Sequence, residues 1–64
     1  MVDAHELLNE QDVSTLTKVP RATLRAWRCR GSGPPFLRLS ARTVRYRRDQ
    51  VDAWLRSREV ERTA

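Results

Sequence analysis

The sequence predicts a mostly α-helical domain with one small β-hairpin, in the order helix, turn, helix, hairpin, helix. Helix start and stop signals enclose two short segments that lie only a few residues apart. Apolar and polar side chains then alternate along two short runs, as they do in strands. A final segment has apolar residues at the spacing of one helix face. Because the chain has 64 residues, we expect one domain over residues 1–64, with its core within about 7–58.

The first helix is predicted to begin after Asn9 and to end near Thr17. Asn9 is a good N-cap residue, and Asp12 three positions later completes a variant of the capping box. Leu8 and Val13 have the spacing of a hydrophobic staple, which fixes the angle at which a chain enters a helix. This pattern predicts a well-defined helix start.

The second helix is predicted between Pro20 and Gly31. Proline suits a first turn because it lacks the N–H that would have no partner there, and glycine ends helices because it adopts the left-handed conformation without strain. Leu24 and Trp27 fall on the side that faces the core. The opposite side carries Ala22, Arg25, Ala26 and Cys29, flanked by Arg21 and Arg28. Since few residues separate the first two helices, they form a helix-turn-helix unit, with Val19 in the turn.

Strands are predicted at residues 36–40 and 44–47, with Arg42 near the tip of the hairpin, and a closing helix from 48 to about 58. Arginines alternate with apolar residues along both strands, so that one face displays positive charge. The expected core, taken from all elements, consists of Leu7, Leu8, Val13, Leu16, Val19, Leu24, Trp27, Leu37, Leu39, Val44, Tyr46, Val51, Trp54 and Leu55.

Charge is divided sharply along the chain. No carboxylate occurs between Val13 and Arg48, and all eight acidic residues lie outside that interval. The basic residues inside it are Lys18, Arg21, Arg25, Arg28, Arg30, Arg38, Arg42, Arg45, Arg47 and Arg48. Such a one-sign segment suggests a polyanionic partner, and the preference for arginine suits phosphate and base-edge geometry.

The outer face of the second helix is the first candidate DNA-binding surface. Arg21 and Arg25 are the candidates for contact with base edges in the major groove, and Ala22 permits close approach. Thr23 is a candidate for a phosphate contact at the groove rim, or alternatively a partly buried spacer. A solvated basic helix face with no ligand is the competing interpretation for the whole helix.

The hairpin supplies the second candidate surface. Arg42 suits an adjacent minor groove, whose negative potential attracts arginine. Arg28, Arg45 and Arg47 are expected to follow the DNA backbone. Together the elements indicate a winged helix-turn-helix that binds double-stranded DNA.

Other classes of function fit the sequence less well. So short a chain has no room for a deep catalytic cavity, and we expect no enzymatic activity, cofactor or small-molecule substrate. His5 lacks partners at ligand spacing, so no metal site is expected, and Cys29 is expected to be a small surface residue rather than a nucleophile. We expect no membrane binding, and a cytoplasmic location.

The order and spacing of several segments resemble excisionase and AlpA-type DNA-binding domains, which are related to the MerR family. The segments are Leu7-Leu8 with Val13 and Leu16; residues 19–24 with Trp27 and Gly31; residues 33–39; residues 44–48; and Val51 with residues 53–55. The chain departs from the pattern at Lys18, where such domains often have glycine, and at Pro20, where they often have a serine cap.

The resemblance implies a phage or plasmid excisionase, a recombination directionality factor. Such a protein binds cooperatively to repeated attachment sites, bends the DNA and directs an integrase towards excision. An integrase partner and self-association along tandem sites are therefore expected. A small AlpA- or MerR-like transcriptional regulator is the alternative within DNA binding, and a basic protein-interaction or antitoxin-like module is the alternative of another class.

Overall fold

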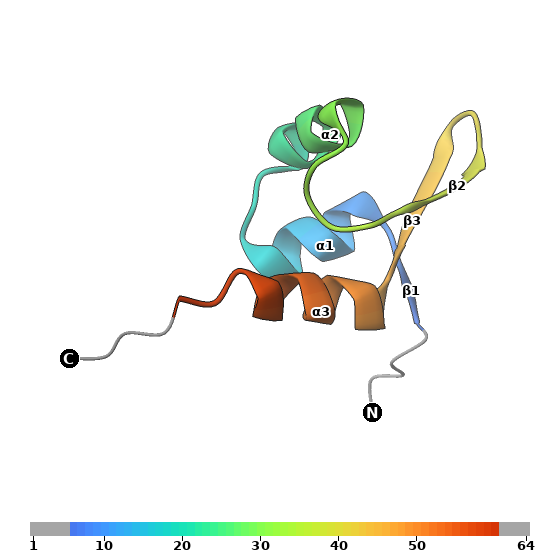
Figure 1. Cartoon of the computed structure of the whole chain (residues 1–64). Coiled ribbons are helices and arrows are strands. Elements are labelled where there is room, and N and C mark those ends of the chain that lie inside the picture. The colour runs from blue at the N-terminus through green and yellow to red at the C-terminus, as the bar shows by residue number, and fades with distance from the viewer. Residues whose placement is uncertain (1–5, 61–64) are drawn as a thin grey trace.

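The computed structural model describes residues 6–60 and confirms the predicted fold class. Its elements are β1 (Leu7–Leu8), α1 (Glu10–Thr17), α2 (Arg21–Arg30), β2 (Leu37–Ser40), β3 (Thr43–Arg47) and α3 (Arg48–Ser57). In Figure 1, α1 lies between α2 above and α3 below, and the β2–β3 hairpin projects to one side as the wing. Within the described residues, no helix combines the length and apolar character needed to cross a membrane. The architecture is that of a winged helix-turn-helix.

The start of α1 confirms the predicted capping box. The side chain of Asn9 accepts a hydrogen bond from the backbone N–H of Asp12 at 2.7 Å, and the Asp12 carboxylate accepts one from the N–H of Asn9 at 3.0 Å. Leu8 and Val13, the two sides of the predicted staple, are both buried in the core. The chain therefore enters α1 at a fixed angle.

The turn between α1 and α2 is closed by backbone geometry and by the hydroxyl groups of Ser14 and Thr17, both of which hydrogen-bond to the backbone of Val19. Lys18 adopts the left-handed conformation with φ of 62°, which explains why glycine is common at this position in the domains that the sequence resembles. The hydroxyl of Ser14 donates a hydrogen bond of 2.7 Å to the carbonyl of Val19. Pro20 is the N-cap of α2, one position before the predicted first turn, because its ψ of 145° is not helical. Gly31 ends the helix in the left-handed region, as predicted.

β1 is an element that the sequence did not predict. It pairs antiparallel with β3, with Leu8 opposite Tyr46, and gives a sheet of order β1-β3-β2. The N–H of Arg48 donates to the carbonyl of Glu6 at 2.9 Å and extends the same pairing. A strand of two residues is too short to show an alternating pattern. Its pairing partner is far away in the sequence, so local signals do not reveal it.

The wing ends in a two-residue turn made of Ala41 and Arg42, because Ser40 pairs with Thr43. The hydroxyl of Ser40 donates to that of Thr43 at 2.8 Å and closes the turn. The strand register shifts on either side of Leu39, whose side chain is 58% exposed. The predicted core position of Leu39 is therefore wrong, because the irregularity breaks the alternation on which the prediction depended.

Five buried side chains form the core, and every element except β2 supplies one of them. They are Leu8, Val13, Leu24, Tyr46 and Val51. Partly buried side chains pack around them: Leu16, Val19, Trp27, Phe36, Val44 and Leu55. Leu7, also predicted in the core, is 47% exposed, because successive side chains of a strand point to opposite faces. Leu37 is half-buried at the start of the wing.

Trp54 on α3 lies at the edge of the core rather than within it, which corrects the prediction. Its ring centroid is 5.7 Å from that of Trp27, at an interplanar angle of 52°. The guanidinium of Arg58 lies over the Trp54 ring at 5.4 Å from the centroid. The two tryptophans thus join the end of α3 to α2, and one side of Trp54 is covered by a cation instead of apolar side chains.

Candidate nucleic-acid interface

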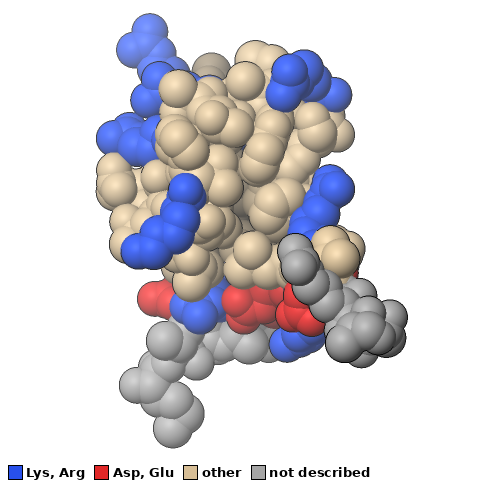
Figure 2. Space-filling model, turned by 90° about the vertical axis from the view of Figure 1, so that its left-hand side faces the viewer, with Lys and Arg blue, Asp and Glu red and all other residues tan. Residues whose placement is uncertain are grey.

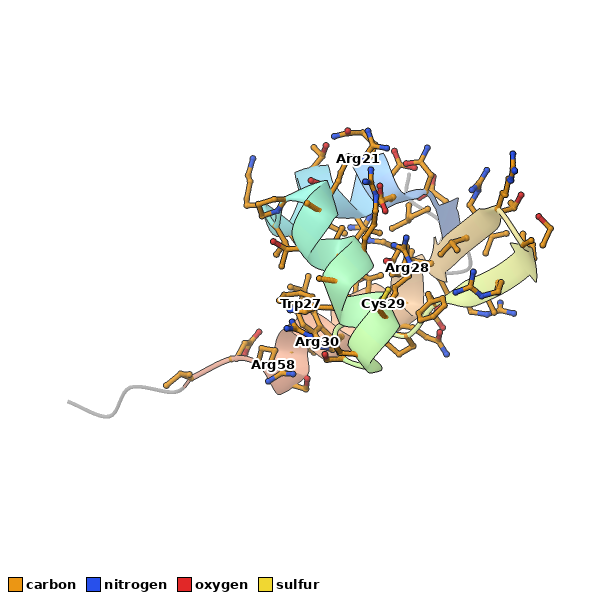
Figure 3. The ribbon with its side chains drawn as sticks, turned by 90° about the horizontal axis from the view of Figure 1, so that it is seen from above. Arg21, Trp27, Arg28, Cys29, Arg30 and Arg58 are labelled. Carbon is orange, nitrogen blue, oxygen red and sulfur yellow. The ribbon has the colours of Figure 1, made fainter. Side chains whose placement is uncertain are left out.

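The outward face of α2 has the predicted character. Ala22 is exposed, and the side chains of Arg21 and Arg25 are 50% and 58% exposed. Thr23 is half-buried, and its backbone N–H donates to the carbonyl of Pro20 at 3.0 Å. Figure 3 looks down on this face, with Arg21 near the beginning of the helix. The small and basic residues are therefore open to a partner that approaches from this side.

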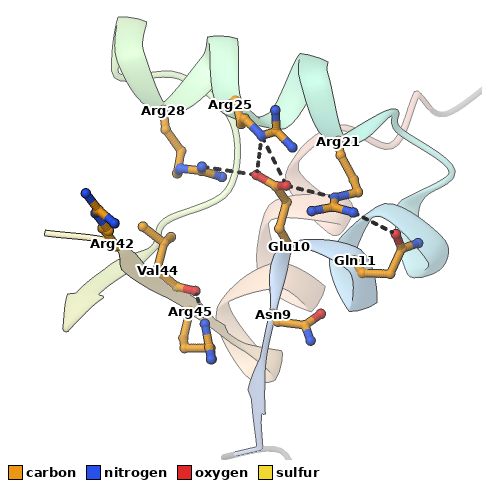
Figure 4. A pocket seen from close by; sticks show the side chains of 9 residues that line it. All are labelled: Asn9, Glu10, Gln11, Arg21, Arg25, Arg28, Arg42, Val44 and Arg45. Atoms are coloured by element: carbon orange, nitrogen blue, oxygen red, sulfur yellow. Dashed lines mark hydrogen bonds and ion pairs between the residues drawn. The ribbon is translucent and has the colours of Figure 1, made fainter. Parts of the chain in front are cut away.

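An open hollow of about 430 Å³ lies between the start of α1, the outer side of α2 and the wing (Figure 4). It is lined by Asn9, Glu10, Gln11, Arg21, Arg25, Arg28, Arg42, Val44 and Arg45. Five of these are arginines that the sequence singled out as DNA contacts. The fold therefore brings the candidate residues of α2 and of the wing to one place, although the nearest of them, Arg28 and Arg42, are 14 positions apart in the sequence.

Glu10 occupies the middle of this hollow. Its Oε1 accepts a hydrogen bond from Nε of Arg21 at 2.9 Å, and both of its oxygens lie 3.2 Å from Nε of Arg25. Its Oε2 lies 3.1 Å from Nη2 of Arg28. Only 15% of the Glu10 side chain is exposed (Figure 4). One carboxylate is thus shared by three arginines of α2, an arrangement that the sequence did not predict.

The arginines determine the protonation of Glu10. Burial alone raises the pKa of its carboxyl, but hydrogen bonds from Arg21 and Arg28, the charge of Arg25 and a hydrogen bond from Arg25 together hold the pKa below its ordinary value. The carboxylate is therefore ionised near neutral pH and cancels part of the positive charge in the hollow.

Arg28 has partners within the protein on three sides. Its Nη1 donates to the hydroxyl of Tyr46 at 2.9 Å, Nη2 pairs with Glu10, and the guanidinium lies 5.9 Å from the ring centroid of Phe36. Burial lowers its pKa, but the hydrogen bonds that it donates to Tyr46 and Glu10 outweigh burial and hold the pKa above its ordinary value. With 15% of its side chain exposed, Arg28 joins α2 to the sheet. Its contact with the DNA backbone remains a prediction.

The three arginines of the wing that were predicted to contact DNA differ in how strongly they are held. Arg42 is exposed at the turn, where the sequence placed it. Arg45 is half-buried, and its Nη1 donates to the carbonyl of Val44 at 2.8 Å. Arg47 is exposed at the end of β3, outside the residues that line the hollow. The wing therefore presents Arg42 and Arg45 beside α2, and Arg47 further away.

Charge is separated on the folded molecule as well as along the chain. On the side shown in Figure 2, the acidic side chains gather low on the molecule, and most lysine and arginine side chains lie above them. The carboxylates of α3 include Asp52, which accepts from Nε of Arg48 at 3.2 Å. Glu10 departs from this separation, because it lies among the arginines of α2.

The sequence contained one signal that pointed towards Glu10. The capping box at Asn9 gives Glu10 the first helical position of α1, next to Gln11, which accepts from Nη1 of Arg21 at 3.5 Å. The missing information was the angle between α1 and α2, which tertiary packing sets. Cys29 is exposed on α2, as expected of a surface residue, and its lack of nucleophilic chemistry stays a prediction. His5 lies outside the described residues.

Comparison with known proteins agrees with this geometry. Neither a search of curated proteins nor a search of solved structures finds a match. A family described as "Helix-turn-helix domain" matches residues 7–59, which includes every helix and strand of the structure. This match covers most of the chain, and the fold that it implies is the fold observed. The chain therefore belongs to the helix-turn-helix domain family, whose fold points to DNA binding.

Proposed function

We propose that this protein is a sequence-specific, non-enzymatic DNA-binding protein of the excisionase type, which bends attachment-site DNA and directs an integrase towards excision. One observation supports DNA binding above all others: arginines of α2 and of the wing line the same open hollow. A helix and a hairpin beside each other can contact a groove and the adjacent backbone of one duplex.

Each part of this surface has a distinct proposed role. α2 enters the major groove, where Arg21 and Arg25 read base edges and Ala22 allows the helix to approach closely. Thr23 contacts a phosphate at the groove rim. Arg42, exposed at the wing turn, enters the neighbouring minor groove.

Contacts with the DNA backbone come from Arg45 and Arg47 of β3. Arg28 adds positive charge near the backbone, but its main proposed role is to hold α2 against the sheet, because Tyr46 and Glu10 already engage its guanidinium. In the proposed interface, some arginines therefore contact base edges, others contact the DNA backbone, and Arg28 holds α2 in place.

The excisionase role depends on the resemblance of residues 7–55 to excisionase and AlpA-type domains. In this role the protein acts in the cytoplasm, at the nucleoid, without cofactor or small-molecule substrate. Neighbouring copies on tandem sites place the acidic residues of α3, among them Asp49 and Asp52, near the basic side of the next copy. Transcriptional regulation of the AlpA type is the second candidate, favoured by the same exposed face of α2.

A salt series tests DNA binding. The affinity for a mixed-sequence duplex of about 20 base pairs is measured at several salt concentrations. We expect log affinity to fall linearly with log salt, because bound arginines release counterions from the phosphates. No measurable affinity for the duplex at low salt would overturn the proposal and favour the protein-interaction or antitoxin-like module.

A recombination assay separates the two DNA-binding candidates. The protein is added, together with an integrase, to a supercoiled substrate that carries that integrase's two attachment sites. We expect excised product to increase with protein concentration, and duplexes with tandem sites to be occupied cooperatively and bent. If the protein represses a promoter but leaves excision unchanged, it is a transcriptional regulator.

A further inference from the structure

We infer that Glu10 is a specificity-determining positioning residue of the DNA interface, which fixes Arg21 and Arg25 in place and weakens the binding of this surface to DNA of any sequence. The inference rests on the proposed function, in which these two arginines read base edges. Glu10 itself touches no base in this proposal. It acts through the two side chains that it holds.

The atoms that Glu10 engages leave the reading ends of the arginines available. It accepts from Nε of both Arg21 and Arg25. Among the hydrogen bonds of residues 6–60, none uses the Nη atoms of Arg25, and Nη1 of Arg21 makes a 3.5 Å hydrogen bond to Gln11. A bidentate contact with guanine can use the two Nη groups. Glu10 therefore holds each guanidinium group by its Nε and leaves the Nη groups to bind DNA.

Fixing these side chains favours specific recognition. An unpaired arginine loses much rotamer freedom when it binds, and an arginine that is already held loses less. Glu10 is itself well held, because 15% of its side chain is exposed and Arg28 fixes it from the other side. The carboxylate thus transmits the rigidity of the core, through Arg28 and Tyr46, to the two exposed arginines.

The negative charge has a second effect. Nonspecific binding depends mainly on the number of phosphates that basic side chains neutralise. A carboxylate in the middle of three arginines reduces the positive potential of α2 and competes with phosphate for the same donors. Since specificity is a difference between two affinities, weakening the binding to all sequences while preserving base contacts increases discrimination.

Two substitutions at Glu10 and one matched control test the inference. Glu10→Gln removes the charge, Glu10→Asp keeps the charge but shortens the side chain, and Glu59→Gln removes a charge from an exposed residue beyond α3. Each protein is titrated with a mixed-sequence duplex and with the best duplex that the unaltered protein selects from a randomised pool. The discrimination ratio is the affinity for the selected duplex divided by that for the mixed one.

The three variants have different expected results. Glu10→Gln binds the mixed duplex about 3- to 10-fold more tightly, with a steeper salt dependence, and its discrimination ratio falls about tenfold. Glu10→Asp leaves the affinity for the mixed duplex near that of the unaltered protein, but lowers the ratio because its carboxylate does not reach both Nε atoms. Glu59→Gln leaves the ratio unchanged, because screening weakens distant exposed charges.

Other outcomes overturn the inference. If the discrimination ratio of Glu10→Gln equals that of Glu59→Gln, Glu10 does not determine specificity. If Glu10→Asp equals the unaltered protein in both affinities, the effect is one of charge alone and positioning is wrong. If the unaltered protein binds neither duplex at low salt, the proposed function itself fails, which the series shows before any variant is compared.

A measurement on the unaltered protein does not depend on the folding of the variants. The Nε–H resonances of Arg21 and Arg25 are followed by NMR while the selected duplex is added. We expect both to keep the slow solvent exchange of a hydrogen bond to Glu10 in the complex. If, in the complex, the Nε–H protons of Arg21 and Arg25 exchange with solvent as fast as the Nε–H of exposed Arg30, the carboxylate releases both side chains on binding and the positioning role is wrong.

Discussion

The hydroxyl of Tyr46 accepts a hydrogen bond of 2.9 Å from Nη1 of Arg28 and so connects the middle strand of the sheet to the helix proposed to enter the major groove. Tyr46 is fully buried, and its ring packs at 6.4 Å from that of Phe36. The polar tip of the largest core side chain is thus paired with a cation, and the orientation of α2 depends on a residue of the wing.

Tyr46→Phe isolates this hydrogen bond, because the ring and its packing are retained. We expect unfolding free energy to fall by about 1.5–3 kcal/mol, the usual contribution of a hydrogen bond to a charged group. Urea denaturation followed by tryptophan fluorescence measures the change. An unchanged midpoint would show that water replaces the hydroxyl as the partner of Arg28.

Lys18→Gly relieves the left-handed strain in the turn between α1 and α2. A residue with a Cβ is disfavoured at φ of 62°, whereas glycine loses more entropy on folding, so we expect a net stabilisation of about 0.5–1 kcal/mol. Thermal unfolding is the measurement, and Lys18→Ala is the control. An equal gain for alanine would assign the effect to the lost charge instead of the backbone.

Gly33→Ala and Gly31→Ala separate steric conflict from backbone strain. Both glycines have positive φ, but a Cβ at Gly33 would lie 2.8 Å from Cε3 of Trp27, whereas one at Gly31 meets nothing within 4 Å. We expect Gly31→Ala to cost about 1 kcal/mol of stability, and Gly33→Ala about 1–3 kcal/mol more. If chemical denaturation shows that both variants lose the same unfolding free energy, the Trp27 ring moves aside freely.

The stability conferred by Glu10 should depend on pH. Since the pKa of Glu10 in the folded protein lies below the ordinary value of 4.5, the ionised carboxylate stabilises the fold above that value. This contribution is lost as pH falls through the lowered pKa. We expect the stability difference between the unaltered protein and Glu10→Gln to shrink below pH 4.5 in denaturation curves measured between pH 7 and 3. A difference that stays constant would show that the arginine contacts do not depend on the charge.

Arg25 and Arg45 should affect DNA binding differently. Arg25→Ala is expected to weaken binding to the selected duplex by about 1–3 kcal/mol and to relax the sequence preference, because a base contact is lost. Arg45→Ala should weaken binding to the selected and mixed duplexes more evenly, because a backbone contact carries no sequence information. Fluorescence anisotropy titrations with both duplexes measure this. Equal losses for the two variants on both duplexes would contradict the division of roles.

Local signals in the sequence sufficed for most of the fold. The capping box at Asn9, the stop at Gly31 and the spacing of Val51 and Leu55 each depend on a few neighbouring residues, and the structure confirms them. The errors occur where distant parts meet. Two-residue β1 exists only through its pairing with β3, and the exposed position of Leu39 follows from a register shift that no local pattern indicates.

The candidate site shows the same division. Sequence reasoning identified the arginines from charge alone, and the structure places those of α2 beside Arg42 and Arg45. Sequence reasoning identified neither Glu10 as the common partner of these arginines nor the burial of Arg28, because both depend on how α1 and the sheet pack against α2. Charge along a chain predicts which residues form a surface, but not how they pair on it.

The two strands of the wing contribute unequally to stability. β3 carries Tyr46 and Val44 into or against the core, whereas β2 has no fully buried side chain and the turn is exposed. Replacement of the exposed residues Arg38 and Leu39 of β2, and of Ala41–Arg42, is therefore expected to leave the core intact. The outer half of this hairpin is a suitable position for grafting loops of other lengths, so that the reach of the domain along DNA can be redesigned without rebuilding its interior.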